Sequence, residues 1–130
     1  MVRMDGPSVE RWVAGYERAW RTAGAEPLAE LFTPDVSYLP SPWADPIVGL
    51  DALGTWWDAE RDGPDEDFTM TSEVIAVEGD RAVVRLDVDY RRDVPSRWRD
   101  LWVLRFAPDG RCAAFEEWPF APGQPDGHEP

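Results

Sequence analysis

The hydrophobic pattern of this chain changes its period once, and that change limits the folds open to it. Over residues 9–23 apolar side chains recur every three or four positions, which predicts an amphipathic helix capped by Asp5 or Ser8 and ended by Gly24. From Phe68 onward the period becomes two, which is typical of strands with one buried face. Helices that precede antiparallel strands predict an α+β fold, with the helices packed on one face of a curved sheet.

Between these regions the sequence predicts two more helices and a strand interrupted by prolines. The stretch EPLAELF indicates a short helix, and LDALGTWWDAE indicates a third helix with either Trp56 or Trp57 inward. Residues 35–49 (DVSYLPSPWADPIVG) contain three prolines, so we expect an edge strand or a loop there rather than a central strand. Residues 121–130 are rich in Pro and Gly, which predicts a loose tail after a single domain over residues 1–120.

Two antiparallel hairpins are predicted in the second half of the chain. The first turns at residues 78–80, and its second arm alternates between an apolar and a charged face. Its apolar face holds Ala82, Val84, Leu86, Val88 and Tyr90. The second hairpin joins RWRDLWVLRF to RCAAFEEWPF through the turn APDG.

One strand of the second hairpin places a carboxylate on its aromatic face. Alternation puts Asp100 on the same side as Trp98 and Trp102. An unpaired buried charge is costly, so we expect Asp100 to have a partner, a shifted pKa or access to water. If APDG is a tight two-residue turn, Glu117 lies directly opposite Asp100, and one of the two carboxyl groups can then hold a proton.

The same turn sets the neighbouring pairs. The predicted opposed pairs are Leu104–Ala113, Trp102–Phe115 and Asp100–Glu117. A slip of one residue pairs Trp102 with Glu116 instead and turns Glu117 outward. A second interpretation of the same pattern is that both carboxyl groups lie at the solvent-exposed edge of the cavity.

Composition excludes several classes of function. The formal net charge of −13 argues against binding to nucleic acid or to an anionic membrane surface. No segment approaches the length of a membrane span, so we expect a cytoplasmic protein. The single Cys112 and the single His128 leave no intrachain disulfide, no histidine-based triad and no zinc site. We therefore expect no metal and no cofactor, and an enzyme of this composition has to use carboxylates, tyrosines and arginines.

The stretch LAELFTPDVSYLPSPWADPIVGLDALGTWW resembles the NTF2-like superfamily, in particular its SnoaL-like, polyketide cyclase-like branch. GDRAVV and RFAPDGRCAAFEEW resemble the hairpins of the same family, and the resemblance covers residues 9–120. It implies a cone in which a curved antiparallel sheet encloses a cavity beneath three N-terminal helices. It does not imply one activity, because this fold hosts isomerases, cyclases, dehydratases, epoxide hydrolases and non-catalytic binders.

Similarity to ketosteroid isomerase, a distant relative, extends to one of its three catalytic positions. Tyr16 falls at the oxyanion tyrosine, whereas Pro40 and Trp102 stand at the two aspartates. The histidine of the His/Asp pair attributed to SnoaL cyclases has no counterpart here. The resemblance therefore implies the fold and a cavity-lining Tyr16, but not the known catalytic sets.

These observations define a predicted site for a small hydrophobic or aromatic molecule. Its predicted catalytic residues are Asp100, Glu117 and Tyr16. Its predicted substrate-binding residues are Tyr38, Trp43, Trp56, Tyr90, Trp98, Trp102 and Phe115. A tryptophan-rich core without any cavity is the alternative interpretation of the aromatic residues.

We expect a cofactor-independent lyase, isomerase or cyclase that uses carboxylate and tyrosine acid–base chemistry. The alternatives are a non-catalytic ligand-binding or accessory domain and a protein-association module. The outer face of the sheet carries Leu101 and Val103 among arginines, which favours a homodimer through that face.

Overall fold

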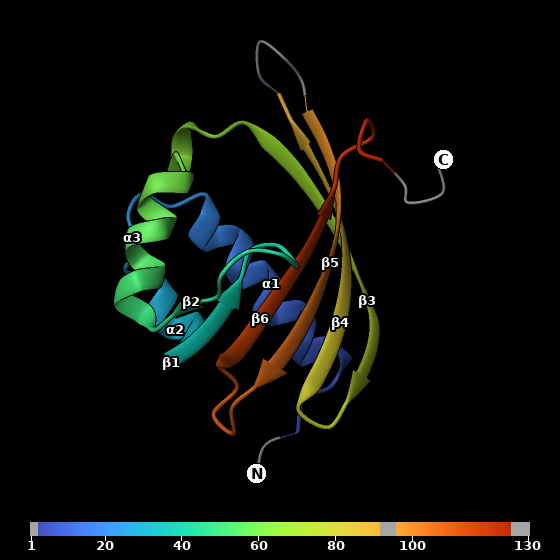
Figure 1. Ribbon diagram of the computed structural model, residues 1–130. Helices are drawn as coiled ribbons and strands as arrows, with labels where there is room; N and C mark the ends of the chain where they lie inside the picture. The colour runs from blue at the N-terminus through green and yellow to red at the C-terminus, as the bar shows by residue number, and fades with distance from the viewer. Residues whose placement is uncertain (1–2, 92–95, 126–130) are drawn as a thin grey trace.

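The computed structural model describes residues 3–91 and 96–125, and Figure 1 shows the path of the chain. Helices come first, as predicted, and four long strands follow. The elements are α1 (Gly6–Trp20), α2 (Leu28–Leu31), β1 (Phe32–Leu39), β2 (Ile47–Val48), α3 (Leu50–Glu60), a 3₁₀ turn (Gly63–Asp65), β3 (Phe68–Glu78), β4 (Arg81–Tyr90), β5 (Ser96–Phe106) and β6 (Cys112–Phe120).

The strands form one curved sheet in the order β2-β1-β6-β5-β4-β3. Figure 1 shows α1 crossing the concave face of this sheet, with α3 on the side of β1 and β2. The predicted α+β cone is confirmed. The expectation of a wholly antiparallel sheet is wrong for one pair, because β1 and β6 run parallel, joined through a long crossover that contains α3 and four strands.

Helix α1 begins as predicted. The side chain of Asp5 accepts a hydrogen bond from the backbone N–H of Ser8 at 2.8 Å and so caps the first turn. One face of the helix is buried against the sheet. Its buried residues are Val9, Trp12, Val13, Tyr16, Ala19 and Trp20.

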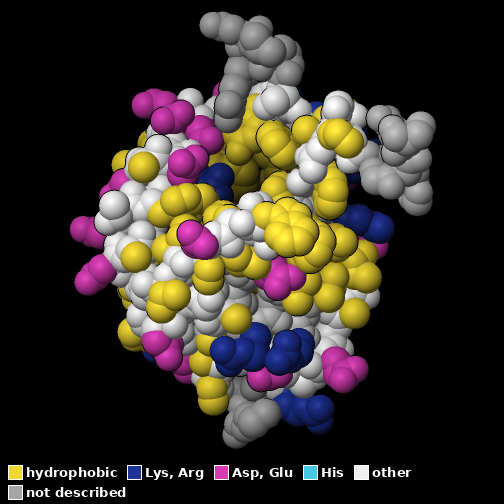
Figure 2. All heavy atoms as spheres, in the orientation of Figure 1, with side chains coloured by type: hydrophobic (Ala, Val, Ile, Leu, Met, Phe, Trp, Pro, Cys, Tyr) yellow, Lys and Arg dark blue, Asp and Glu magenta, His cyan; other side chains and the backbone are white. Residues whose placement is uncertain are grey.

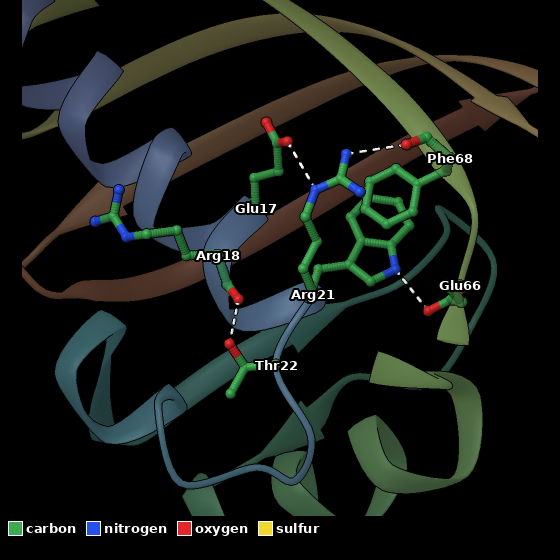
Figure 3. Close-up of polar contacts among 7 residues, drawn as sticks. Glu17, Arg18, Arg21, Thr22, Glu66 and Phe68 are labelled. Carbon is green, nitrogen blue, oxygen red and sulfur yellow. Dashed lines mark hydrogen bonds and ion pairs between the residues drawn. The ribbon is translucent and has the colours of Figure 1, made fainter. Parts of the chain in front are cut away.

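The C-terminal end of α1 is held by β3 and lies before Gly24, the predicted end. The guanidinium of Arg21 donates to the carbonyl oxygen of Phe68 at 3.0 Å and lies 3.9 Å from the centre of its ring (Figure 3). The chain leaves the helix at this point. Ala23, which the pattern places on the buried stripe, is therefore exposed.

Strand β1 is an interior strand, contrary to the expected edge strand or loop. It begins at Phe32, so α2 is a single turn and this predicted helical residue is in a strand. Pro34 lies where the pairing with β6 shifts register, between Phe32 and Ser37, so the missing N–H breaks no regular ladder. The three prolines of the 35–49 segment follow β1, in the loop that leads to the edge strand β2.

The first hairpin follows the prediction. Gly79 and Asp80 form the turn between β3 and β4, and the apolar residues of β4 alternate inward. Tyr90 is the last of them and is half-buried.

The second hairpin pairs two residues away from the predicted register. The observed pairs are Leu104–Phe115, Trp102–Glu117 and Asp100–Pro119. The predicted pairs, each wrong by two residues, are Leu104–Ala113, Trp102–Phe115 and Asp100–Glu117. Because a shift of two keeps each side chain on its face, Asp100 and Glu117 still point to the same side.

Two single-residue insertions cause this shift. The backbone N–H of Ala107 bonds the carbonyl of Arg111 at 2.8 Å, so the loop has three residues, and Gly110 adopts the positive φ of 87° that such a loop needs. One residue further into β6, Ala113 is left out of the ladder where the register shifts between Arg105 and Phe106.

Strand β6 ends at Phe120, and a turn follows in which Gln124 bonds the carbonyl of Ala121 at 3.1 Å. The rest of the predicted tail, residues 126–130 with His128, lies outside the described residues. Within residues 3–91 and 96–125, no helix combines the length and the apolar character needed to cross a membrane.

The two faces of the sheet should respond differently to the same truncation. Leu86→Ala on the concave face should lower the free energy of unfolding by about 2–5 kcal/mol, because it leaves a cavity in the core. Leu101→Ala on the outer face, where the side chain is 40% exposed, should cost less than about 1 kcal/mol. Urea denaturation of both variants measures the difference, and equal losses would contradict the assignment of faces.

Candidate functional site

A pocket of about 360 Å³ opens between the C-terminal end of α1, the end of α3 and the concave face of β4, β5 and β6. Figure 2 shows a hollow walled by hydrophobic side chains, with acidic and basic side chains beside it. Seven of the ten predicted site residues line this pocket. They are Tyr16, Trp56, Tyr90, Trp98, Asp100, Trp102 and Glu117.

The two carboxyl groups lie on neighbouring strands of the pocket wall. Asp100 stands opposite Pro119 and Glu117 opposite Trp102, so the two groups are diagonal neighbours on one face. Glu117 accepts a hydrogen bond from the indole Nε1 of Trp102 at 3.1 Å. Asp100 is only 8% exposed, and within the described residues its Oδ1 has no hydrogen-bond partner.

This environment keeps a proton on the pair at neutral pH. Burial, a hydrogen bond to Glu117 and the negative charge of Glu117 raise the pKa of Asp100 to about 9, and the positive charge of Arg61 opposes the shift. A protonated Asp100 is a hydrogen-bond donor inside an aromatic pocket. The pair can therefore offer both an acid and a base to a molecule bound beside it.

Tyr16 lies at the base of the pocket in a chain of buried polar groups. Its hydroxyl is 2.8 Å from the hydroxyl of Tyr38 and accepts a hydrogen bond from Nη2 of Arg61 at 2.9 Å. Burial raises the pKa of the Tyr16 hydroxyl, although Arg61 pulls the other way, so the group remains protonated.

The donors and acceptors in this group of three side chains indicate the direction of the hydrogen bond between Tyr16 and Tyr38. Tyr38 is fully buried, and the one hydrogen bond found for its hydroxyl among the described residues is to Tyr16, where either oxygen can be the donor. We assign Tyr38 as the donor, because the opposite direction leaves the Tyr38 proton without an acceptor in the core, whereas this one leaves the Tyr16 proton at the pocket. Arg61 occupies the second lone pair of the Tyr16 oxygen. The proton of Tyr16 is then left to donate into the pocket that this residue lines.

Three predicted site residues do not line the pocket. Tyr38 and Phe115 are fully buried behind Tyr16, and the Phe115 ring stacks on that of Tyr38 with 4.3 Å between centroids. These two residues support Tyr16 from the core. Trp43 is 99% exposed in the loop after β1, and the structure does not bring it into the pocket.

Trp20, which belongs to the predicted apolar stripe of residues 9–23, forms part of the pocket wall. Its Nε1 donates to the carboxylate of Glu66 at 2.8 Å, one of the contacts drawn in Figure 3. The same carboxylate accepts the backbone N–H of Asp62 at 3.1 Å. Glu66 thus fixes both the tryptophan ring and the chain that follows α3.

Arg61 is the functional residue that the sequence analysis missed. It follows α3 directly, and its guanidinium lies over the Trp20 ring at 4.1 Å and near the Trp57 ring at 4.9 Å. Burial opposes its charge, but Tyr16, Tyr38 and Glu117 raise the pKa of Arg61, so it stays charged. One signal was present: Arg61 is the only basic residue between Arg21 and Arg81, and two tryptophans precede it by about one helical turn.

No metal centre is found in the part of the chain that the structure describes. Its cysteine, aspartate and glutamate side chains form no group of three or more that could hold an ion. The ionisable and hydroxyl-bearing residues that line the pocket include Asp100, Glu117, Tyr16 and Arg61.

Comparison with known proteins gives the family and the fold. The sequence profile described as "SnoaL-like domain" matches residues 9–115. No curated protein matches the chain.

Among solved structures, SalBIII is an epoxide hydrolase/cyclase-like enzyme with a role in pyran ring formation in the polyether salinomycin. It is 15% identical, with 89% of this chain and 93% of that chain covered and a TM-score of 0.72. A ketosteroid isomerase-like protein from Erwinia carotovora atroseptica SCRI1043 is 21% identical, with coverage of 90% and 97% and a TM-score of 0.65. An LEH-like epoxide hydrolase from Mycobacterium tuberculosis is 11% identical, with coverage of 88% and 84% and a TM-score of 0.65. At these identities the likeness establishes the fold alone.

The proton on Asp100 should make stability depend on pH. The folded protein keeps this proton up to a pKa of about 9, whereas the unfolded chain releases it near pH 4, so the stabilisation is complete below about pH 4 and is lost as the pH rises to about 9. The slope from this group is at most about 1.4 kcal/mol per pH unit. Asp100→Asn should remove it, as measured by urea denaturation at several pH values.

The exposed Asp89, which pairs with Arg97 at 3.6 Å on the outer face, provides the control. Asp89→Asn should give a profile parallel to that of the unmodified protein. Identical slopes for the unmodified protein and Asp100→Asn would show that Asp100 holds no extra proton when folded.

Proposed function

Because this chain belongs to the SnoaL-like domain family, we propose that its pocket binds a small hydrophobic cyclic molecule and moves a proton on it without a cofactor. The reaction classes are isomerisation, cyclisation and elimination next to a carbonyl group. One observation carries the proposal: Asp100, with its raised pKa, lies beside Glu117 among tryptophan rings. A neutral acid and a base in one apolar pocket are what such chemistry requires at neutral pH.

The hydrogen bonds suggest which carboxyl group acts as the base and which as the acid. Glu117 takes a proton from the carbon next to the substrate carbonyl, and Asp100 returns a proton to the product. The indole of Trp102 holds Glu117 in place at 3.1 Å. Since Asp100 is nearly enclosed, it exchanges protons with the bound molecule more readily than with bulk water.

Tyr16 is proposed to bind the carbonyl oxygen. Its hydroxyl receives hydrogen bonds from Arg61 and, by the count of donors above, from Tyr38, and both make it a stronger donor to a developing enolate. The positive charge of Arg61 stabilises the same negative oxygen through Tyr16. Ketosteroid isomerase is the relative in which such a tyrosine is known, but the carboxyl groups here occupy other positions, so a different substrate is proposed.

Exchange of hydrogen for deuterium at carbon tests this chemistry without knowledge of the natural substrate. Hydrophobic cyclic ketones incubated with the protein in D₂O should exchange their α-hydrogens faster than in buffer, as measured by NMR. Glu117→Gln and Asp100→Asn should each slow the exchange by about 100-fold or more. Tyr16→Phe should slow it by about 100-fold to 1,000-fold, because it removes the donor to the enolate oxygen.

Glu116→Gln is the matched control, because Glu116 is the next residue of β6 and faces outward, where it accepts a hydrogen bond from Trp118. It should leave the exchange rate unchanged. If ketones bind but never exchange above the buffer rate, the pocket belongs to a non-catalytic binding domain. A protein that binds none of them, yet associates with other proteins, would support the association module instead.

The outer face of the sheet is proposed to form a homodimer. Leu101 and Trp118 are cross-strand neighbours there, each 40% exposed, and Phe120 is 48% exposed. Around them lie exposed ion pairs, among them Arg99 with Asp87 at 3.1 Å. An apolar centre with a charged rim is the usual anatomy of such an interface.

Leu101→Arg should convert the dimer to a monomer, because two copies would then place like charges opposite each other at the centre of the interface. Analytical ultracentrifugation measures the change, with Ile75→Arg on β3 as a control at an equally exposed apolar residue away from this cluster. A protein that is monomeric before substitution rules the interface out.

A further inference from the structure

Arg61 is the only basic side chain among the described residues that line the pocket. A guanidinium has five N–H bonds, and Arg61 uses one of them, from Nη2 to the hydroxyl of Tyr16. Its Nε is buried and has no hydrogen-bond partner in the described part of the chain. No carboxylate of residues 3–91 and 96–125 makes an ion pair with it.

A half-buried charge that makes no direct ion pair is costly, even though Glu117 in the same pocket favours the charged form of Arg61. Tryptophan rings provide part of the compensation, at 4.1 Å for Trp20 and 4.9 Å for Trp57. Ring faces satisfy charge but accept no conventional hydrogen bond. The Nε–H group in the plane of the guanidinium therefore still lacks an acceptor in the described part of the chain, and Arg61 lines the pocket.

We propose that Arg61 is an anion-binding residue and that the pocket selects a hydrophobic monocarboxylate. The carboxylate of the ligand accepts N–H bonds from the guanidinium, in the planar geometry that suits this pair of groups. Its hydrocarbon body lies against Trp56, Trp98 and Trp102. The inference deepens the proposed function by naming the substrate class, and it rests on that function only for the reaction at Asp100 and Glu117.

The other charges of the pocket restrict the ligand to one carboxylate. Glu60, Glu66 and Glu117 also line it, and all three repel an additional negative charge. Arg61 can offset one carboxylate, whereas a dicarboxylate would place its second group near these acidic residues. Monocarboxylates should therefore bind more tightly than dicarboxylates of the same ring system.

Calorimetry with matched probes tests the inference by binding alone. The probes are 2-naphthoate, its neutral amide 2-naphthamide, and naphthalene-2,6-dicarboxylate, all at one ionic strength. The unmodified protein should bind the monocarboxylate at least about tenfold more tightly than the amide, because charged hydrogen bonds replace neutral ones. It should also prefer the monocarboxylate to the dicarboxylate.

Arg61→Gln should abolish the preference for the carboxylate over the amide, and Arg61→Lys should retain part of it. Arg85→Gln is the control, because Arg85 is exposed on the outer face and pairs with Glu73 at 3.0 Å. It should leave all affinities unchanged. If Arg61→Gln does not fold, the affinities of the unmodified protein and of Arg61→Lys for the carboxylate and the amide still test the inference.

Equal affinity for carboxylate and amide, or no binding of either, overturns the inference. The result is separable from the proposed function. Ketone exchange without a carboxylate preference would leave the acid–base chemistry standing and remove the anion site. A carboxylate preference without exchange of any ketone or carboxylate probe would support the anion site and remove the acid–base chemistry.

Discussion

The packing of α1 into the concave face of the sheet sets the position of everything else. Trp12 lies at the centre of this contact, with the rings of Phe32, Trp102, Phe106 and Phe115 all within 6.4 Å of its own. Its Nε1 donates to the carbonyl of Leu31 at 2.9 Å, which ties the helix to α2 as well. Aromatic side chains therefore fill one end of the cone completely. Because α1 ends at Trp20, the other end is left uncovered, and the pocket occupies that space.

The polar groups of the pocket are arranged on its two sides. Arg61 enters from the helical side and Glu117 from the sheet, and no direct ion pair joins them. The pocket is also lined by Asp100, which retains a proton, and by Tyr16, which is left with a proton to donate. Burial behind aromatic rings strengthens each of these interactions relative to water, because the local dielectric constant is lower.

Much of this arrangement was accessible from the sequence because face assignment depends only on alternation. Alternation along β5 placed Asp100 on the aromatic face, whereas the inward face of Glu117 depended on a predicted two-residue turn, with an outward Glu117 as the alternative. The observed register differs from the predicted one by two positions, so Glu117 keeps the inward face. The register itself depends on loop length and on the bulge at Ala113, which no alternation pattern reveals. The parallel pairing of β1 and β6 is a contact between distant segments, and local patterns carry no information about it.

Arg61 was missed for a related reason. It follows a helix within an acidic stretch, and such residues usually face water. Its burial results from the meeting of α1, α3 and β6, which supply Trp20, Trp57 and Glu117. Trp43 shows the converse error, since its aromatic character suggested a pocket wall but its side chain is exposed to solvent.

The length of the second hairpin loop and its bulge determine which side chains of β6 face the pocket. The three-residue loop and the extra Ala113 each advance the strand by one position, and only their sum keeps Glu117 inside. Loss of either alone would turn the whole strand over, present Glu116 to the pocket and remove Glu117, the proposed base, from it. Surface turns usually tolerate changes in length, but the length of this turn is constrained because it decides which residue of β6 faces the pocket. Insertions and deletions in residues 107–113 should therefore be rare among relatives that keep this carboxyl pair, or should occur in compensating pairs.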